Sequence, residues 1–241
     1  ANLLVGGRVL RTYRDGRAHL NGYLEDYACL AHGLLALYQA DFDPRWFTAA
    51  REIADVMLRR FRDPRGGILY STSDDHEQLL YRPKDFDDNA VPSGNSVAAE
   101  VLLQLGLLTG EDRYRAVTEE ILEALAPSMG SHPLFFGRLL GVLAQDLGNP
   151  VEVAISGDLA SDAAGAMLRE LRAAYMPNKV VAAGPEGATE PPLLSGRTAQ
   201  GAEAALYVCR NFACERPITD PFAVSLALGL LERAPGGFQA L

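Results

Sequence analysis

The sequence predicts a mainly α-helical protein, a segment of an α/α toroid built from helix hairpins, with a small α/β insertion. Three observations predict it. Apolar residues recur at helical spacing in successive segments, two helix pairs are related by an internal repeat, and one later stretch alternates strand and helix patterns. With 241 residues, 48% of them hydrophobic, the chain can bury a sizeable core.

The first helix pair is expected between residues 21 and 62. Apolar residues lie on most sides of its first helix, so this inner helix should be buried on most sides. Asp43 followed by Pro44 predicts the N-cap and the first residue of a second helix. That second helix is amphipathic, with charged residues opposite its apolar face, and is expected to be an outer helix.

A second helix pair, over residues 96–126, repeats the first one. A shift of 68 residues superposes the two pairs without a gap. The matching positions include Arg45-Trp46 with Arg113-Tyr114, Glu52-Ile53 with Glu120-Ile121, and Ala31 with Ala99. The same shift places Ser93-Gly94 opposite Glu25-Asp26, so both segments should lie at the same end of neighbouring inner helices. A third inner helix is expected from His132 to Leu147.

The domain organisation follows from these patterns. Residues 1–150 are expected to form the helix-hairpin segment of the toroid, with a β-hairpin at about 64–84. Residues 151–217 carry strand, helix and strand patterns in turn, which predicts a small α/β insertion. Residues 218–241 should supply a closing helix of the toroid. These helix pairs would make about half of a ring, so we expect the other half to lie upstream.

Composition excludes several classes of function. The net charge of −9 argues against a protein that binds nucleic acid through its phosphates, and against binding to an anionic membrane. No apolar run approaches the roughly 20 residues of a membrane span, and no signal peptide is visible, so a cytoplasmic location is expected. The missing initiator Met indicates a processed or truncated piece. The three cysteines are expected to be reduced thiols.

Three segments of the chain resemble a known family. They read Gly-Tyr-Leu-Glu-Asp-Tyr-Ala at 22–28, Asp-Asp-Asn-Ala-Val-Pro-Ser-Gly-Asn-Ser at 87–96, and Tyr-Val-Cys-Arg-Asn-Phe-Ala-Cys-Glu-Arg-Pro at 207–217. In this order they resemble the C-terminal part of the spermatogenesis-associated protein 20 family, whose bacterial members are called thioredoxin-domain-containing proteins. The resemblance implies a thioredoxin-like domain followed by a toroid similar to six-hairpin glycosidases and N-acylglucosamine 2-epimerases. This chain has no Cys-x-x-Cys motif, so it would lack the thioredoxin-like domain.

Two acidic segments are the candidate catalytic groups: Glu25 with Asp26, and Asp87 with Asp88. A carboxylate in the first turn of a helix is stabilised by the helix dipole. Two carboxylates that face each other across a funnel form the usual acid and base, or acid and nucleophile, of glycoside chemistry. The alternative is structural, because acidic residues favour first turns and helix caps in any protein.

Polar and aromatic residues near the same helix ends are candidate substrate-binding groups. Aromatic rings would stack on a sugar, and amides, hydroxyls and cationic groups would hydrogen-bond its hydroxyls or contact an anion. These residues are Tyr23, Tyr27, Phe86, Asn89, Ser93, Asn95, His132 and Arg138. Packing is the alternative for each ring, and Ser93 is also placed to cap the next helix.

The sequence shows no metal-ligand cluster, phosphate-binding loop or nucleophile elbow, so no metal and no cofactor is expected. Cys209 and Cys214 are more widely spaced than a Cys-x-x-Cys redox pair. Two functions remain open. One is a carbohydrate-active domain that hydrolyses or epimerises a sugar ligand. The other is a non-catalytic interaction or regulatory domain, whose partner would be the N-terminal half of the same protein with its thioredoxin-like domain.

Overall fold

A computed structural model describes residues 2–77 and 80–232. Contacts divide the chain into two compact units. The first comprises Ala1–Gly106 and Glu111–Leu143, and the second comprises Leu107–Gly110 and Ala144–Leu241. Each unit is described by itself. None of the described helices is both long enough and apolar enough to cross a membrane.

The first unit combines a small antiparallel sheet with helix pairs. Its elements are β1 (Leu4–Val5), β2 (Arg8–Arg14), β3 (Arg17–Asn21), α1 (Leu24–Asp41), α2 (Pro44–Phe61), α3 (Gly94–Thr109), α4 (Asp112–Ser131), a 3-10 turn (Pro133–Phe135) and α5 (Gly137–Leu147). The sheet has the order β1-β2-β3. Its link to the helices is the buried residue Val9, whose backbone N–H donates to the hydroxyl of Tyr27 at 3.2 Å.

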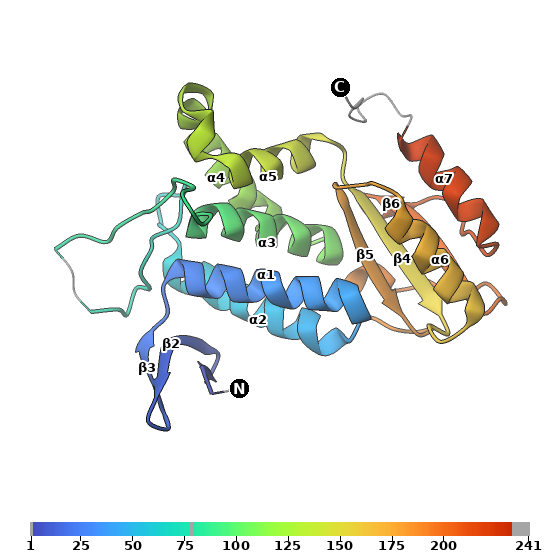
Figure 1. Ribbon diagram of the computed structural model, residues 1–241, viewed down its shortest axis with the longest axis horizontal. Coiled ribbons are helices and arrows are strands. Elements are labelled where there is room, and N and C mark those ends of the chain that lie inside the picture. The colour runs from blue at the N-terminus through green and yellow to red at the C-terminus, as the bar shows by residue number, and fades with distance from the viewer. Residues whose placement is uncertain (1, 78–79, 233–241) are drawn as a thin grey trace. The chain divides into compact units, whose positions relative to one another are not determined.

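The helix pairs form as the periodicity predicts. α1 and α2 lie side by side (Figure 1). Asp43 caps α2, because its carboxylate accepts from the backbone N–H of Arg45 at 3.0 Å. α2 begins at Pro44 and α4 at Asp112, which are 68 residues apart, as the repeat requires. Large aromatic side chains with less than 2% exposure fill the space between the helices: Tyr38, Phe47, Phe61, Tyr114 and Phe136.

The second unit is an α/β sandwich of its own. Its elements are β4 (Val151–Gly157), α6 (Asp162–Ala173), β5 (Lys179–Gly184), a 3-10 turn (Pro192–Leu194), β6 (Ala204–Arg210), β7 (Ala213–Cys214) and α7 (Phe222–Glu232). The sheet order is β5-β4-β6-β7, with β4 parallel to β5 and antiparallel to β6. Every residue of β4 is buried, as expected for a central strand. α6 covers one face of the sheet and α7 lies beside α6 (Figure 1).

The predicted fold class is wrong. Instead of a mainly helical toroid segment with a small insertion, the chain has a three-stranded and a four-stranded sheet in addition to the helix pairs. The strands expected in an insertion build a compact unit with its own core. The helix expected to close the toroid is α7, which belongs to that unit, where Ser225 donates to the carboxylate of Glu170 on α6 at 2.6 Å.

Two local expectations also differ from the structure. The described residues of 64–84 contain no strand. The reason is that the side chain of Asn95 binds both the N–H and the C=O of Leu69, at 2.8 and 3.1 Å, where a ladder partner would otherwise bind. α1 is less buried than its composition indicates, since Leu30 and Leu37 are 38% and 47% exposed on one side of the helix.

Candidate functional site

The carboxylates of Glu25 and Asp26 are held at the first turn of α1 by one arginine. Arg11 lies 2.9 Å from Glu25 and 3.5 Å from Asp26, measured between guanidinium nitrogen and carboxylate oxygen. Asp26 also accepts from the backbone N–H of Tyr23 at 2.8 Å, which closes the start of the helix. The guanidinium of Arg11 lies 4.6 Å from the ring centroid of Tyr23. Both acids therefore hold β2 and the first turn of α1 together.

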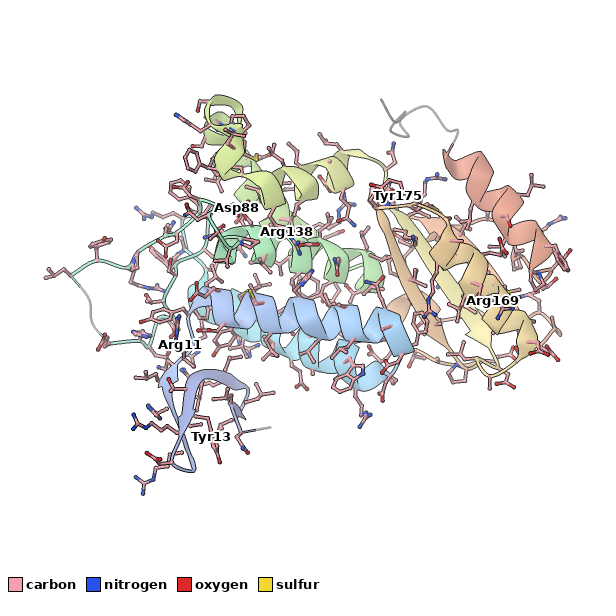
Figure 2. The ribbon with its side chains drawn as sticks, viewed as in Figure 1. Arg11, Tyr13, Asp88, Arg138, Arg169 and Tyr175 are labelled. Atoms are coloured by element: carbon pink, nitrogen blue, oxygen red, sulfur yellow. A yellow bond between two sulfur atoms is a disulfide. The ribbon has the colours of Figure 1, made fainter. Side chains whose placement is uncertain are left out.

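Asp88 connects the starts of two helices. Its carboxylate accepts from the backbone N–H of Ser93, just before α3, at 2.9 Å, and from the backbone N–H of Arg138, in the first turn of α5, at 2.8 Å. Both of its oxygens therefore bind N–H groups that a helix leaves unpaired at its N-terminus. Its neighbour Asp87 is exposed. Figure 2 shows Asp88 and Arg138 near the ends of α3 and α5.

Three predicted substrate-binding residues lie inside the structure. Tyr27 is 2% exposed and packs on Phe61, with ring centroids 5.1 Å apart. Asn95 is fully buried and donates to the carbonyls of Leu69 and Asp85. Ser93 caps α3, because its hydroxyl oxygen accepts from the N–H of Ser96 at 3.1 Å. None of the three is placed to reach a ligand from solvent.

The other predicted binding residues lie nearer the surface, and they contact different neighbours rather than one another. Tyr23 lines an open hollow of about 540 Å³ with Arg11 and His76. Phe86 stacks on Phe136, with centroids 6.4 Å apart. The exposed residue His132 ends α4 and contacts Ser131, and Asn89 is exposed in the loop before α3.

Arg138 belongs to a polar trio that links three helices. From α5 its Nε donates to Glu100 on α3, and its Nη2 lies 2.8 Å from the Nε2 of His32 on α1. His32 Nε2 in turn lies 3.6 Å from the carboxylate of Glu100. The side chains of His32, Glu100 and Arg138 are 34%, 17% and 35% exposed, so solvent reaches each of them.

The Nε2 atom of His32 faces both Arg138 and Glu100. Arginine has only donors and a carboxylate only acceptors, so the contact with Arg138 needs a lone pair on Nε2 and the contact with Glu100 needs a proton there. Burial raises the pKa of Glu100, but the hydrogen bond to His32 and the charge of Arg138 together hold the pKa below its usual range. The trio thus contains an imidazole, a carboxylate and a guanidinium.

Cys29 lies one helical turn before His32 and is exposed. Burial of its thiol raises its pKa, and the negative charges of Glu25 and Asp26 raise the pKa further, against a smaller opposing effect of Arg138. A thiol in these surroundings stays protonated at neutral pH. The thiol of Cys29 is therefore not a nucleophile activated by the imidazole of His32.

Arg138 is a candidate from the sequence, whereas its two partners His32 and Glu100 are not. A signal for them was present: Glu100 is the only charged residue in the apolar helix α3, and the 68-residue shift places His32 on Glu100. A charged residue in such a helix usually has a partner.

Comparison with known proteins finds relatives that are much longer than this chain. It is 32% identical over 232 residues to human spermatogenesis-associated protein 20, a match that covers 90% of this chain and 30% of the human protein. The mouse protein of the same name is 34% identical over 206 residues. An uncharacterized protein of Caenorhabditis elegans is 22% identical over 215 residues. No family model matches the chain.

The chain spans less than a third of the length of these relatives. Their names give neither a reaction nor a ligand, so the matches show only that the proteins are related. They support the relation to the spermatogenesis-associated protein 20 family that the three motif segments indicate.

Proposed function

We propose that the chain is a carbohydrate-active domain whose chemistry is epimerisation, with His32, Glu100 and Arg138 as the reacting group. The observation that carries the proposal is the imidazole of His32, held beside a carboxylate and a guanidinium on three helices and open to solvent. An imidazole is the side chain best suited to move a proton at neutral pH.

The carboxylates of the acidic segments do not support hydrolysis. Glycoside hydrolysis needs one protonated and one ionised carboxyl group, both directed at the scissile bond. Glu25 and Asp26 share Arg11, and both oxygens of Asp88 bind helix N–H groups. A substrate would have to break these contacts before it could use the acids.

Epimerisation needs a base and a group that stabilises negative charge, and the trio contains both. In the open-chain form of a sugar, the carbon beside the carbonyl loses a proton to a base and regains one on the other face. His32 would accept that proton at a ring nitrogen. Arg138 would then stabilise the negative charge that develops on the carbonyl oxygen, and Glu100 would stabilise the imidazolium. The intermediate then turns its other face to the imidazolium, whose proton has exchanged with solvent, and takes a proton from it, so nothing else is consumed.

Deuterium exchange tests the proposal directly. The protein is incubated in D₂O with a panel of aldoses and N-acetylamino sugars, and proton NMR follows the signal of the proton beside the carbonyl carbon. We expect exchange of one sugar class with the wild-type protein and none with His32→Gln. His19→Gln is the matched control, because His19 is exposed on β3, where a ring nitrogen lies 3.4 Å from the carbonyl oxygen of Arg17. Equal exchange by wild type and His32→Gln, or no exchange with any sugar, would sink the proposal.

A second candidate rests on the exposed apolar side of α1. Leu30 and Leu37 lie two helical turns apart and are both more than a third exposed. This favours an interaction or regulatory domain that contacts a thioredoxin-like domain of the same protein. Titration calorimetry with that domain would show binding that the double variant Leu30→Ser, Leu37→Ser abolishes. Binding that the double variant retains would refute this candidate.

A further inference from the structure

A disulfide joins the two strands of the hairpin β6–β7. Cys209 and Cys214 are opposite each other in the antiparallel register and are bonded to each other, contrary to the reduced thiols expected from the sequence. Cys209 is 1% exposed, whereas Cys214 is exposed. The turn between the strands consists of Asn211 and Phe212, both with positive φ angles, 48° and 62°. One sulfur is thus open to a reactant and its partner is shielded.

The guanidinium of Arg197 contacts both sulfur atoms. The Nη2 of Arg197 donates to the Sγ of Cys214 at 2.9 Å and to the Sγ of Cys209 at 3.6 Å. The rest of this guanidinium is half-enclosed: Nη1 donates to the carbonyl of Ser195 at 3.1 Å, and the buried Nε–H has no hydrogen-bond partner among the described residues. A fixed positive charge beside a sulfur stabilises its thiolate form.

The hairpin is also anchored independently of the disulfide. Glu152 on β4 is 2% exposed, and its carboxylate accepts from the backbone N–H of Phe212 at 2.8 Å. The strands β4 and β6 pair at Glu152 and Cys209. The other charged neighbours, Arg210 and Glu215, pair with each other at 3.8 Å. Two thiols would therefore stay close together after the bond between them is broken.

We propose that Cys209 and Cys214 form a thiol–disulfide exchange site that takes two electrons from a dithiol reductant, with Arg197 stabilising the thiolate of Cys214. A thiolate of the reductant attacks the exposed Sγ of Cys214. The bond between the two cysteine sulfurs breaks, and the Sγ of Cys209 leaves with the electron pair and takes up a proton.

The second thiol of the reductant completes the exchange. It loses its proton and attacks the mixed disulfide at the reductant's own sulfur. The reductant leaves as a disulfide, and Cys214 is released as a thiolate beside Arg197. Two electrons have moved from the dithiol to the cysteine pair. The reverse steps oxidise the pair again when a disulfide is the reactant.

The chain contains its own reference cysteine. Cys29 is exposed as well, but it lies near Glu25 and Asp26, and its pKa is raised by burial and by these charges. In the fully reduced protein at pH 7, iodoacetamide should therefore alkylate Cys214 faster than Cys29. Mass spectrometry of the peptides measures both rates in one sample.

The decisive comparison changes the cation. In Arg197→Gln we expect the alkylation rate of Cys214 at pH 7 to fall about tenfold, because a neighbouring charge shifts a pKa by about one unit or more. Arg197→Lys should keep most of the rate, and Cys29 should react equally in all three proteins. The same measurements in a Cys209→Ser background give a single-thiol version. Its circular dichroism spectrum reports whether the fold is retained.

Two results would overturn the proposal. One is an unchanged alkylation rate of Cys214 in Arg197→Gln. The other is a disulfide that millimolar dithiothreitol does not reduce in the folded wild-type protein, since such a bond would be purely structural. Reduction in the folded state, together with the loss of rate in Arg197→Gln only, supports the site.

Discussion

Replacing Asp88 by Ala should destabilise the first unit by about 2–3 kcal/mol. The residue supplies acceptors to the backbone N–H groups of Ser93 and Arg138, and losing a capping acceptor costs about 1 kcal/mol each. Its charge adds roughly 0.5 kcal/mol at these helix N-termini. Asp88→Asn keeps one acceptor oxygen but loses the other and the charge, so about 1.5 kcal/mol is expected. The comparison separates a capping role from a catalytic one.

Urea denaturation followed by tryptophan fluorescence measures this effect. Trp46 is the only tryptophan of the chain, and it lies in α2 of the first unit, so its signal reports on that unit. Asp87→Ala is the control, because Asp87 is exposed, and it should change stability by less than about 0.5 kcal/mol. The reasoning fails if Asp87→Ala and Asp88→Ala are equally destabilising, or if Asp88→Ala costs less than its Asn counterpart.

Three further changes test the fold and the trio. The pKa of Glu100 is held below its usual range, so its charge stabilises the folded protein above about pH 5, and this contribution is lost as the pH falls through the folded-state pKa. The free energy of unfolding in urea should accordingly be higher for the wild type than for Glu100→Gln at pH 7, and the two values should converge in acid. A difference that stays constant down to pH 2 contradicts this. Asn95→Ala leaves Leu69 without its side-chain partners and should cost about 2–4 kcal/mol in the same assay, whereas a cost below 1 kcal/mol contradicts the buried network. Gly157→Ala should lower the urea concentration at which the second unit unfolds, as followed by circular dichroism. The φ angle of Gly157 is 141°, and the added Cβ would lie 2.3 Å from the carbonyl oxygen of Glu203. An unchanged midpoint of unfolding refutes this.

The sequence predicted those elements whose signals are local. The periodicity located the ends of α1 to α4 to within five residues, and Asp43-Pro44 marked the start of α2. The strand and helix patterns after residue 150 correspond to β4, α6 and β5. The described residues of the β-hairpin expected at 64–84 form no strand, and a distant residue, Asn95, binds the backbone of Leu69. No pattern within that segment reveals such a contact.

For the candidate site, residue types were easier to predict than roles. Acidic residues at helix starts were recognised, but whether a carboxylate caps a helix or faces a ligand depends on which N–H groups other segments bring to it. Asp88 binds Arg138, 50 residues later in the chain. His32, Glu100 and Arg138 meet only because three helices pack together.

By itself the sequence determined where α1 to α4, β4, α6 and β5 form and which faces of the helices are apolar, because these properties depend on spacing along a few turns. The tertiary structure alone decided that the strands build two sheets rather than an insertion in a helical ring, since strand pairing joins residues far apart in the chain. It also decided that Cys209 meets Cys214 beside Arg197, and that His32 meets Glu100 and Arg138. A charged side chain acquires its role from the neighbours that packing supplies.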